Sequence, residues 1–115
     1  MTQVLSSPAE AYVRTINDGD AAGFLALFDR DAEVNDAGRE IRGVDAIRHW
    51  SQTEIFAVQV ALTMLGGTSK DGAEIITAKV DGNFDKTGLP DPLVMDFHIR
   101  TGGDKIARLA CKLAE

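Results

Sequence analysis

Two periods of hydrophobic residues divide this chain. Before residue 55, apolar residues recur at helical spacing. From there onward, apolar and polar residues alternate one by one, which is typical of strands with one buried face. The pattern therefore predicts helices in the first half of the chain and a sheet in the second.

Three helical segments are predicted, with a short strand between the second and the third. The first ends at Asp18-Gly19, where glycine allows a left-handed backbone, and the second begins after Asp20. A strand over residues 32–36 turns at Ala37-Gly38, and the third helix opens at Gly43. The apolar faces of the three helices are formed by Ala9, Tyr12, Val13 and Ile16, by Phe24, Leu27 and Phe28, and by Ile47 and Trp50.

The alternating half predicts four strands. They are expected over residues 56–64, after the turn at Lys70-Asp71-Gly72, around residues 95–100, and after residue 104. Leu89-Pro90-Asp91-Pro92 is expected to be a loop, because proline cannot donate to a strand ladder. The order predicts an α+β fold, with three N-terminal helices packed on a curved antiparallel sheet. Residues 1–115 would form one domain, with a cavity at the open end of the resulting cone.

Charge and cysteine content narrow the class of protein. The 115 residues carry a net charge of −6, which argues against nucleic acid as a partner. No apolar run is long enough to cross a membrane. Cys111 is the only cysteine, and the N-terminal residues lack the basic and apolar regions of a signal peptide. A cytoplasmic protein with no membrane partner is expected.

Three segments resemble the nuclear transport factor 2-like superfamily, also called SnoaL-like or ketosteroid-isomerase-like. They are the helix end Ile16-Asn17-Asp18-Gly19-Asp20, the strand Asp31-Ala32-Glu33-Val34-Asn35-Asp36 and the closing Gly103-Asp104-Lys105-Ile106. The resemblance spans residues 7–113 and implies the cone-shaped fold of that superfamily. It says less about activity, because this fold hosts isomerases, cyclases, other enzymes and non-catalytic binding modules.

The resemblance also implies a catalytic site. Ketosteroid isomerases pair an aspartate base with a tyrosine and a protonated acid that both donate to a developing enolate. Tyr12 and Asp36 are similar in position to that tyrosine and that base. Counting back from Ile106 without a gap aligns Asp96 with the acid.

The alternation of apolar and polar residues in the strand predicted around residues 95–100 gives a different result for Asp96. Met95, Phe97 and Ile99 form its apolar set, so Asp96 would face away from the core. A difference of one residue in the turn at residues 101–104 exchanges the two faces. We favour Met95 as the inward residue and keep Asp96 as the alternative acid.

A small apolar molecule is the expected ligand, and no metal or other cofactor is expected. The residues expected to line the pocket are Phe24, Phe28, Trp50, Val58, Phe97 and Leu113. If the protein is an enzyme, an isomerase or cyclase is indicated. The alternatives are a non-catalytic ligand-binding module and a dimerisation module, and the superfamily resemblance implies a homodimer.

Overall fold

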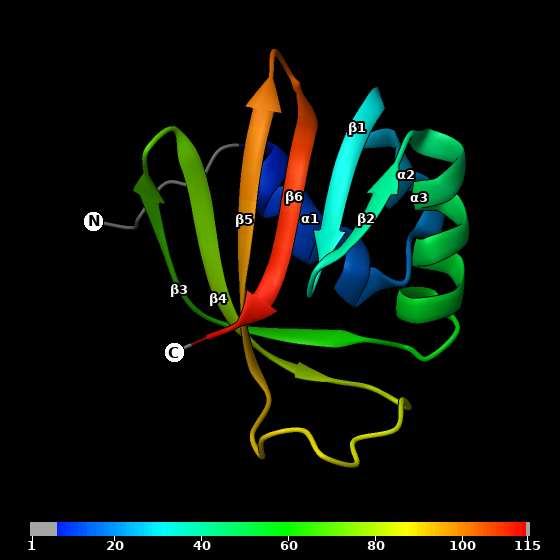
Figure 1. The fold of residues 1–115 in the computed structure, drawn as a ribbon, viewed down its shortest axis with the longest axis vertical. Coiled ribbons are helices and arrows are strands. Elements are labelled where there is room, and N and C mark those ends of the chain that lie inside the picture. The colour runs from blue at the N-terminus through cyan, green and yellow to red at the C-terminus, as the bar shows by residue number, and fades with distance from the viewer. Residues whose placement is uncertain (1–6, 115) are drawn as a thin grey trace.

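One mixed sheet of six strands organises the computed structural model, which describes residues 7–114 (Figure 1). The strand order across the sheet is β2-β1-β6-β5-β4-β3, and the helices cover one of its faces. The elements are α1 (Ser7–Asp18), α2 (Ala21–Ala26), β1 (Phe28–Asp36), β2 (Arg39–Arg42), α3 (Val44–Ser51), a π-helical turn η1 (Gln52–Phe56), β3 (Ala61–Lys70), β4 (Ala73–Asp81), β5 (Val94–Gly102) and β6 (Lys105–Leu113).

The predicted α+β class is confirmed, and strands lie between the second and third helices, where the sequence pattern placed one. Helix α3 follows the β1–β2 hairpin, whose turn at Ala37-Gly38 has positive φ at both residues. The second helix is shorter than expected. It ends at Ala26, and Phe28 opens β1, because strand pairing with β6 captures this residue opposite Ile106.

The sheet is mixed, where an antiparallel one was expected. β1 pairs with β6 in parallel, while the other neighbouring strands are antiparallel. The two strands come from opposite ends of the chain, so no hairpin turn forces them to run in opposite directions. Alternation within a strand does not report the direction of its neighbour, so the sequence pattern was silent here.

The strand expected over residues 56–64 begins later, at Ala61. Residues 52–56 form η1, and Gln59 has a left-handed φ of 54° that interrupts any strand before it. The amide of Val60 donates to the carbonyl of Ile55 over 3.0 Å and closes the turn. The side chain of Asn17 then fixes the start of β3 to the end of α1, since it both donates to and accepts from the backbone of Leu62.

A β-bulge sets the register of β5 against β6. Thr101 pairs with Ile106, but Arg100 pairs with Arg108, so Ala107 is an extra residue in β6. Beyond the bulge, Phe97 pairs with Cys111 and Met95 with Leu113. Without the bulge, Asp96 would stand opposite Cys111. The extra residue therefore exchanges the inward and outward residues of β5, compared with a pairing of β5 and β6 that has no bulge.

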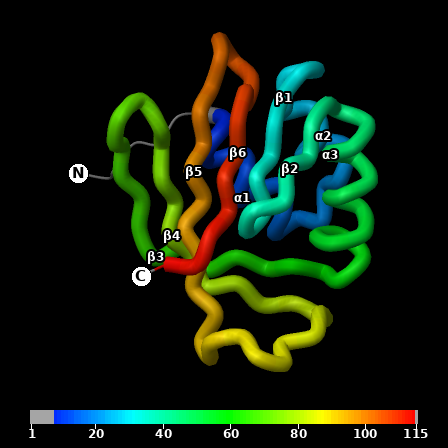
Figure 2. The backbone as a smooth tube through the Cα atoms, in the orientation of Figure 1, coloured from blue at the N-terminus to red at the C-terminus, as the bar shows by residue number. Residues whose placement is uncertain are grey.

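The segment between β4 and β5 is the long loop expected around residues 89–92. In Figure 2 it extends beyond the end of the sheet, next to the segment that leads from η1 into β3. The amide of Asn83 donates to the carbonyl of Val58 over 2.7 Å, which ties the two segments together. Three apolar side chains of this loop, those of Phe84, Leu89 and Leu93, line a cavity at the open end of the fold.

Candidate functional site

Two adjoining cavities open at the end of the sheet where β1 finishes. The inner cavity has a volume of about 110 Å³, and the outer cavity about 520 Å³. Five residues line both and so mark the junction between them: Asp36, Glu54, Val60, Val80 and Met95. The inner cavity is also lined by Tyr12, Ile16, Trp50, Ile55, Leu62, Phe97 and Cys111.

Tyr12 supplies a hydroxyl group to the inner cavity. The residue is 1% exposed, because it sits in the middle of α1 and its ring packs against Phe24 and Phe97 at centroid distances of 5.7 and 5.4 Å. Burial raises the pKa of its phenol well above the ordinary value, and the neighbouring Cys111 thiol and Asp36 carboxylate add to the shift. Tyr12 therefore stays a neutral hydrogen-bond donor at physiological pH.

Cys111 lies in the same cavity on β6. Burial raises the pKa of its thiol far above the ordinary value, and the charge of Asp36 raises it further. The residue is 4% exposed and free of any disulfide. A thiol in such surroundings is a poor nucleophile, so Cys111 serves as an apolar wall and as a neighbour of the Tyr12 hydroxyl.

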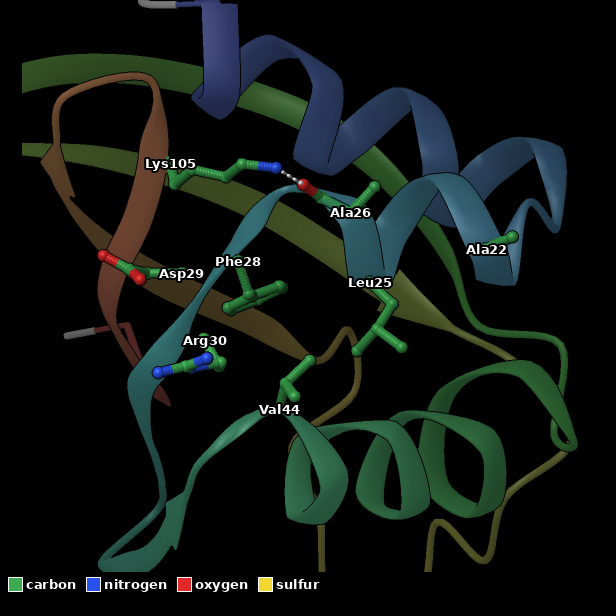
Figure 3. Close-up of a pocket in the computed structure, with 8 residues that line it drawn as sticks. All are labelled: Ala22, Leu25, Ala26, Phe28, Asp29, Arg30, Val44 and Lys105. Atoms are coloured by element: carbon green, nitrogen blue, oxygen red, sulfur yellow. Dashed lines mark hydrogen bonds between the residues drawn. The ribbon is translucent and has the colours of Figure 1, made fainter.

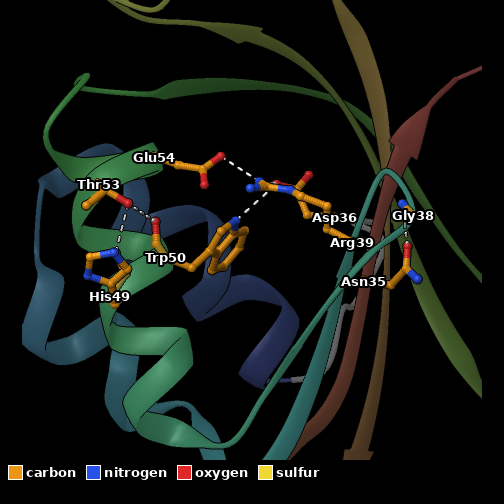
Figure 4. A network of polar contacts seen from close by, with 8 residues as sticks. All are labelled: Asn35, Asp36, Gly38, Arg39, His49, Trp50, Thr53 and Glu54. Atoms are coloured by element: carbon orange, nitrogen blue, oxygen red, sulfur yellow. Dashed lines mark hydrogen bonds and ion pairs between the residues drawn. The ribbon is translucent and has the colours of Figure 1, made fainter.

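Asp36, the last residue of β1, is held by two donors (Figure 4). The Trp50 indole donates from Nε1 to Oδ2 over 3.0 Å, and Arg39 donates from its guanidinium to the same oxygen over 2.6 Å. Within the described part of the chain, no hydrogen bond reaches Oδ1. The Asp36 side chain is 22% exposed, so this carboxylate sits at the boundary between apolar cavity and solvent.

Glu54 brings a second carboxylate to the junction, and the same guanidinium holds it. Arg39 donates to Oε1 of Glu54 over 2.6 Å. Glu54 lies in η1, where the wider helical turn after α3 carries it toward β1. Sequence reasoning missed both Glu54 and Arg39. Glu54 was expected just before a strand at residue 56, and Arg39 just after a turn, so neither had a place in the site. Their opposite charges alone were no signal of contact.

Asp96 does not face the cavities, which corrects the expectation that it could supply the third catalytic group. It lies on the outer face of β5, where Thr77 donates to its carboxylate over 2.6 Å. The bulge at Ala107 is the physical reason, since it places Met95 and Phe97 inward. Of the three predicted catalytic residues, the structure brings Tyr12 and Asp36 together and leaves Asp96 outside.

The predicted pocket residues divide into three groups. Trp50 and Phe97 line the inner cavity, and Val58 and Leu113 line the outer one. Phe24 lines neither, since it is fully buried among aromatic rings. Phe28 lines a separate surface hollow between α2, β1 and α3 (Figure 3). Phe28 was expected on a longer second helix, and the early end of α2 removes it from the site. Phe24 does lie on α2, but its ring is packed in the core.

The described residues give no other chemistry to this site. Across residues 7–114, no group of three or more His, Cys, Asp or Glu side chains has the geometry of a metal site. In that same range, no helix is long and apolar enough to cross a membrane. The linings contain the Tyr12 hydroxyl, the Cys111 thiol, two carboxylates bridged by an arginine, apolar walls, and the hydroxyl of Thr53, which donates to the backbone of His49.

A sequence comparison decides the family. Residues 9–109 match the sequence model of the SnoaL-like domain. The chain belongs to the SnoaL-like family. No curated protein sequence matches it significantly.

Solved structures share the fold of this SnoaL-like protein. A candidate polyketide cyclase from Sinorhizobium meliloti is 25% identical, with a TM-score of 0.82 over 94% of this chain and 95% of that one. A Catenulispora acidiphila protein with a ketosteroid isomerase-like fold, solved with trimethylamine, is 20% identical, with a TM-score of 0.78 over 96% of this chain and 88% of that one. A computationally designed 17-OHP binder is 18% identical, with a TM-score of 0.76 over 93% and 90%. The last two likenesses speak for the fold alone.

Proposed function

We propose that this SnoaL-like protein binds a small, mostly apolar carbonyl compound and isomerises or cyclises it by acid–base chemistry. One observation carries the proposal: Asp36 and Tyr12 line the same cavity, so a base and a neutral donor face one ligand. The inner cavity of about 110 Å³ is small for such a ligand. Since typical ligand pockets have about 300–1,000 Å³, the ligand would extend into the outer cavity.

The chemistry would begin with proton transfer to Asp36. Oδ1 would take a proton from the carbon next to the carbonyl, and the electron pair of that C–H bond would move onto the carbonyl oxygen. The Tyr12 hydroxyl would donate to the resulting enolate oxygen. Return of the proton to another carbon completes an isomerisation. Attack of the enolate carbon on a second carbonyl closes a ring instead, and the oxygen of that carbonyl then takes the proton from Asp36.

A Δ5-3-oxosteroid tests the enzymatic proposal, because its isomerisation creates a conjugated enone that absorbs in the ultraviolet. Asp36→Asn is expected to lower turnover by about 10²- to 10⁴-fold, the usual contribution of a general base. Asp96→Asn is the matched control, since it makes the same change on the outer face, and it should leave turnover unchanged. Equal loss in both variants, or full activity of Asp36→Asn, would contradict the proposal.

A non-catalytic binding module is the second proposal, and one observation favours it. With Asp96 on the outer face, the cavities contain one neutral donor for an enolate instead of two. Binding of 2-naphthol, a neutral phenol that resembles an enol, distinguishes the two proposals. A wild-type protein that binds 2-naphthol and shows no isomerisation of the steroid supports the binding module.

The homodimer and the cytoplasmic location remain predictions. We propose that the dimer forms through the outer face of the sheet, where polar residues such as Lys79, Asp96, His98 and Arg108 alternate with the inward set. Arg108 also forms an ion pair with Glu33 within the chain, so only part of its charge would serve the dimer interface. Sedimentation of the wild type against Arg100→Glu and Arg108→Glu tests the dimer, which should dissociate on charge reversal.

A further inference from the structure

The linings of the two cavities have an unbalanced charge. Among the described residues that line the cavities, Asp36 and Glu54 contribute carboxylates, and none contributes a cationic side chain. Both carboxylates lie at the junction, where any ligand that fills the two cavities must pass. Left alone, two carboxylates beside apolar walls would attract cations and would repel each other.

Arg39 supplies the missing positive charge from outside the cavities. It follows the hairpin turn at Ala37-Gly38, and its guanidinium donates to Asp36 and to Glu54, over 2.6 Å in each case. The two hydrogen bonds raise the pKa of Arg39 above its already high ordinary value, so the group stays charged. Both hydrogen bonds leave from Nη2, whose two N–H groups serve one carboxylate each.

We infer that Arg39 sets the charge preference of the ligand site and positions Asp36 within it. By neutralising one of the two carboxylates at the junction, it keeps the cavities suited to a neutral ligand. Because Arg39 and Trp50 both bind Oδ2 of Asp36, they leave Oδ1 as the oxygen that meets the ligand. This inference rests on the proposed function of the same cavities, and it names Arg39 as a specificity-determining and positioning residue.

A pair of probes of equal size measures the charge preference. 1-Naphthylmethanol is neutral and 1-naphthylmethylamine is cationic at pH 7, and their dissociation constants can be measured by calorimetry. The ratio of affinities, cation over neutral, is expected to rise about tenfold in Arg39→Met, because two carboxylates lose their shared counter-ion. It should fall below the wild-type ratio in Glu54→Gln, which removes one carboxylate and leaves Arg39 in place.

Arg42→Met is the matched control. Arg42 lies on the same hairpin, three residues further on, and its side chain is 70% exposed beside Glu33. Its removal changes the net charge of the protein by the same amount, and Arg42 lines neither cavity. The ratio in Arg42→Met should equal that of the wild type. Arg39→Lys, which keeps the charge, should stay closer to the wild type than to Arg39→Met.

Trp50 gives a second readout of positioning. It is the only tryptophan, so its indole N–H gives a single NMR signal that reports the bond to Asp36. This signal should shift in Arg39→Met, remain in place in Arg42→Met, and return toward the wild-type position in Arg39→Lys.

The outcomes separate this inference from the proposed function. If the probes bind and the ratio is the same in wild type, Arg39→Met and Glu54→Gln, Arg39 does not set the preference and the inference is overturned. If Arg39→Met does not fold, Arg39→Gln, which also removes the charge, takes its place: a raised ratio supports the inference, and an unchanged one overturns it. If neither probe binds the wild type or any variant, the cavities hold no such ligand, which overturns the proposed function and with it this inference.

Discussion

The two faces of β5 come from alternate residues of one nine-residue strand, yet they have opposite characters. The inner face presents Met95, Phe97 and Ile99 to the core and the cavities. The outer face carries Asp96, His98 and Arg100. Asp96 accepts a hydrogen bond from Thr77 on β4, and Arg100 donates to the backbone of Asp71 in a turn. A carboxylate on the outer face therefore cannot act in the cavity, even when both of its neighbours in sequence line that cavity.

The same comparison explains why the site contains Asp36 and excludes Asp96. Both are aspartates on strands of one sheet, and each accepts a short hydrogen bond from a neighbouring side chain. Asp36 ends β1 on the inner side and lines both cavities. Asp96 is one residue out of phase with the inner set. The four changes below test this difference, from the largest expected effect to the smallest.

Phe97→Ala should be the most damaging change to stability. Its side chain is 5% exposed and packs on Tyr12, so truncation leaves a void in the core. Loss of about 3–5 kcal/mol in the free energy of unfolding is expected from urea titrations. His98→Ala, the same truncation one residue further on, should cost less than about 1 kcal/mol. Similar losses in the two variants would remove the distinction between the faces.

Tyr12→Phe should weaken binding of 2-naphthol by about tenfold, the equivalent of one lost hydrogen bond at the upper end of the usual range. The ring stays in place, so the packing against Phe24 and Phe97 is retained. Fluorescence titration measures the affinity. Thr77→Val removes a hydroxyl from the outer face and serves as the control. If Tyr12→Phe binds 2-naphthol as tightly as the wild type, or if Thr77→Val weakens binding as much as Tyr12→Phe does, the ligand does not contact the phenol.

Asp96→Asn should lower the free energy of unfolding by about 1 kcal/mol, because the bond from Thr77 loses its charged acceptor. Binding of 2-naphthol should remain the same, since the change lies on the other face of the sheet. Thermal unfolding and the same fluorescence titration check both parts. A loss of binding without a loss of stability would place Asp96 in the ligand site after all.

His98 should produce the smallest effect, a change in the pH dependence of stability. Burial lowers the pKa of His98, and the charge of Lys112 lowers it further, while Asp96 acts against the shift. Within the described residues, its buried Nε2 atom has no hydrogen-bond partner. The folded protein thus binds a proton on His98 less readily than the unfolded chain does.

Stability should therefore fall as the pH drops below about 6.5, the ordinary pKa of histidine, and should be unaffected by His98 above it. Urea titrations at pH 7.5 and 5.5 measure the change. His98→Gln should lose less stability over this interval than the wild type, since all other titrating groups are shared. An identical loss in the two proteins would show that His98 is not held in its neutral form.

The sequence predicted much of the fold, and it predicted Tyr12 and Asp36 in the site but not Glu54 or Arg39. The turns at Gly19, Ala37-Gly38 and Asp71-Gly72 are where the sequence placed them, because the glycine of each turn readily adopts the positive φ that it has there. The alternation in β5 favoured Met95 as the inward residue, which the structure has. Glu54 and Arg39 could not be predicted, since their meeting depends on a π-helical turn and a hairpin that are far apart in sequence.

The sequence by itself determined the α+β class and, through its resemblance to a known superfamily, the family and the pairing of Tyr12 with Asp36. The class follows from hydrophobic period and turn chemistry, which act over a few residues. Only the tertiary structure decided that β1 runs parallel to β6, that Asp96 faces outward, and that one arginine joins two carboxylates at the cavity junction. Each depends on how distant segments pair. One extra residue, Ala107, is enough to exchange the faces of a strand.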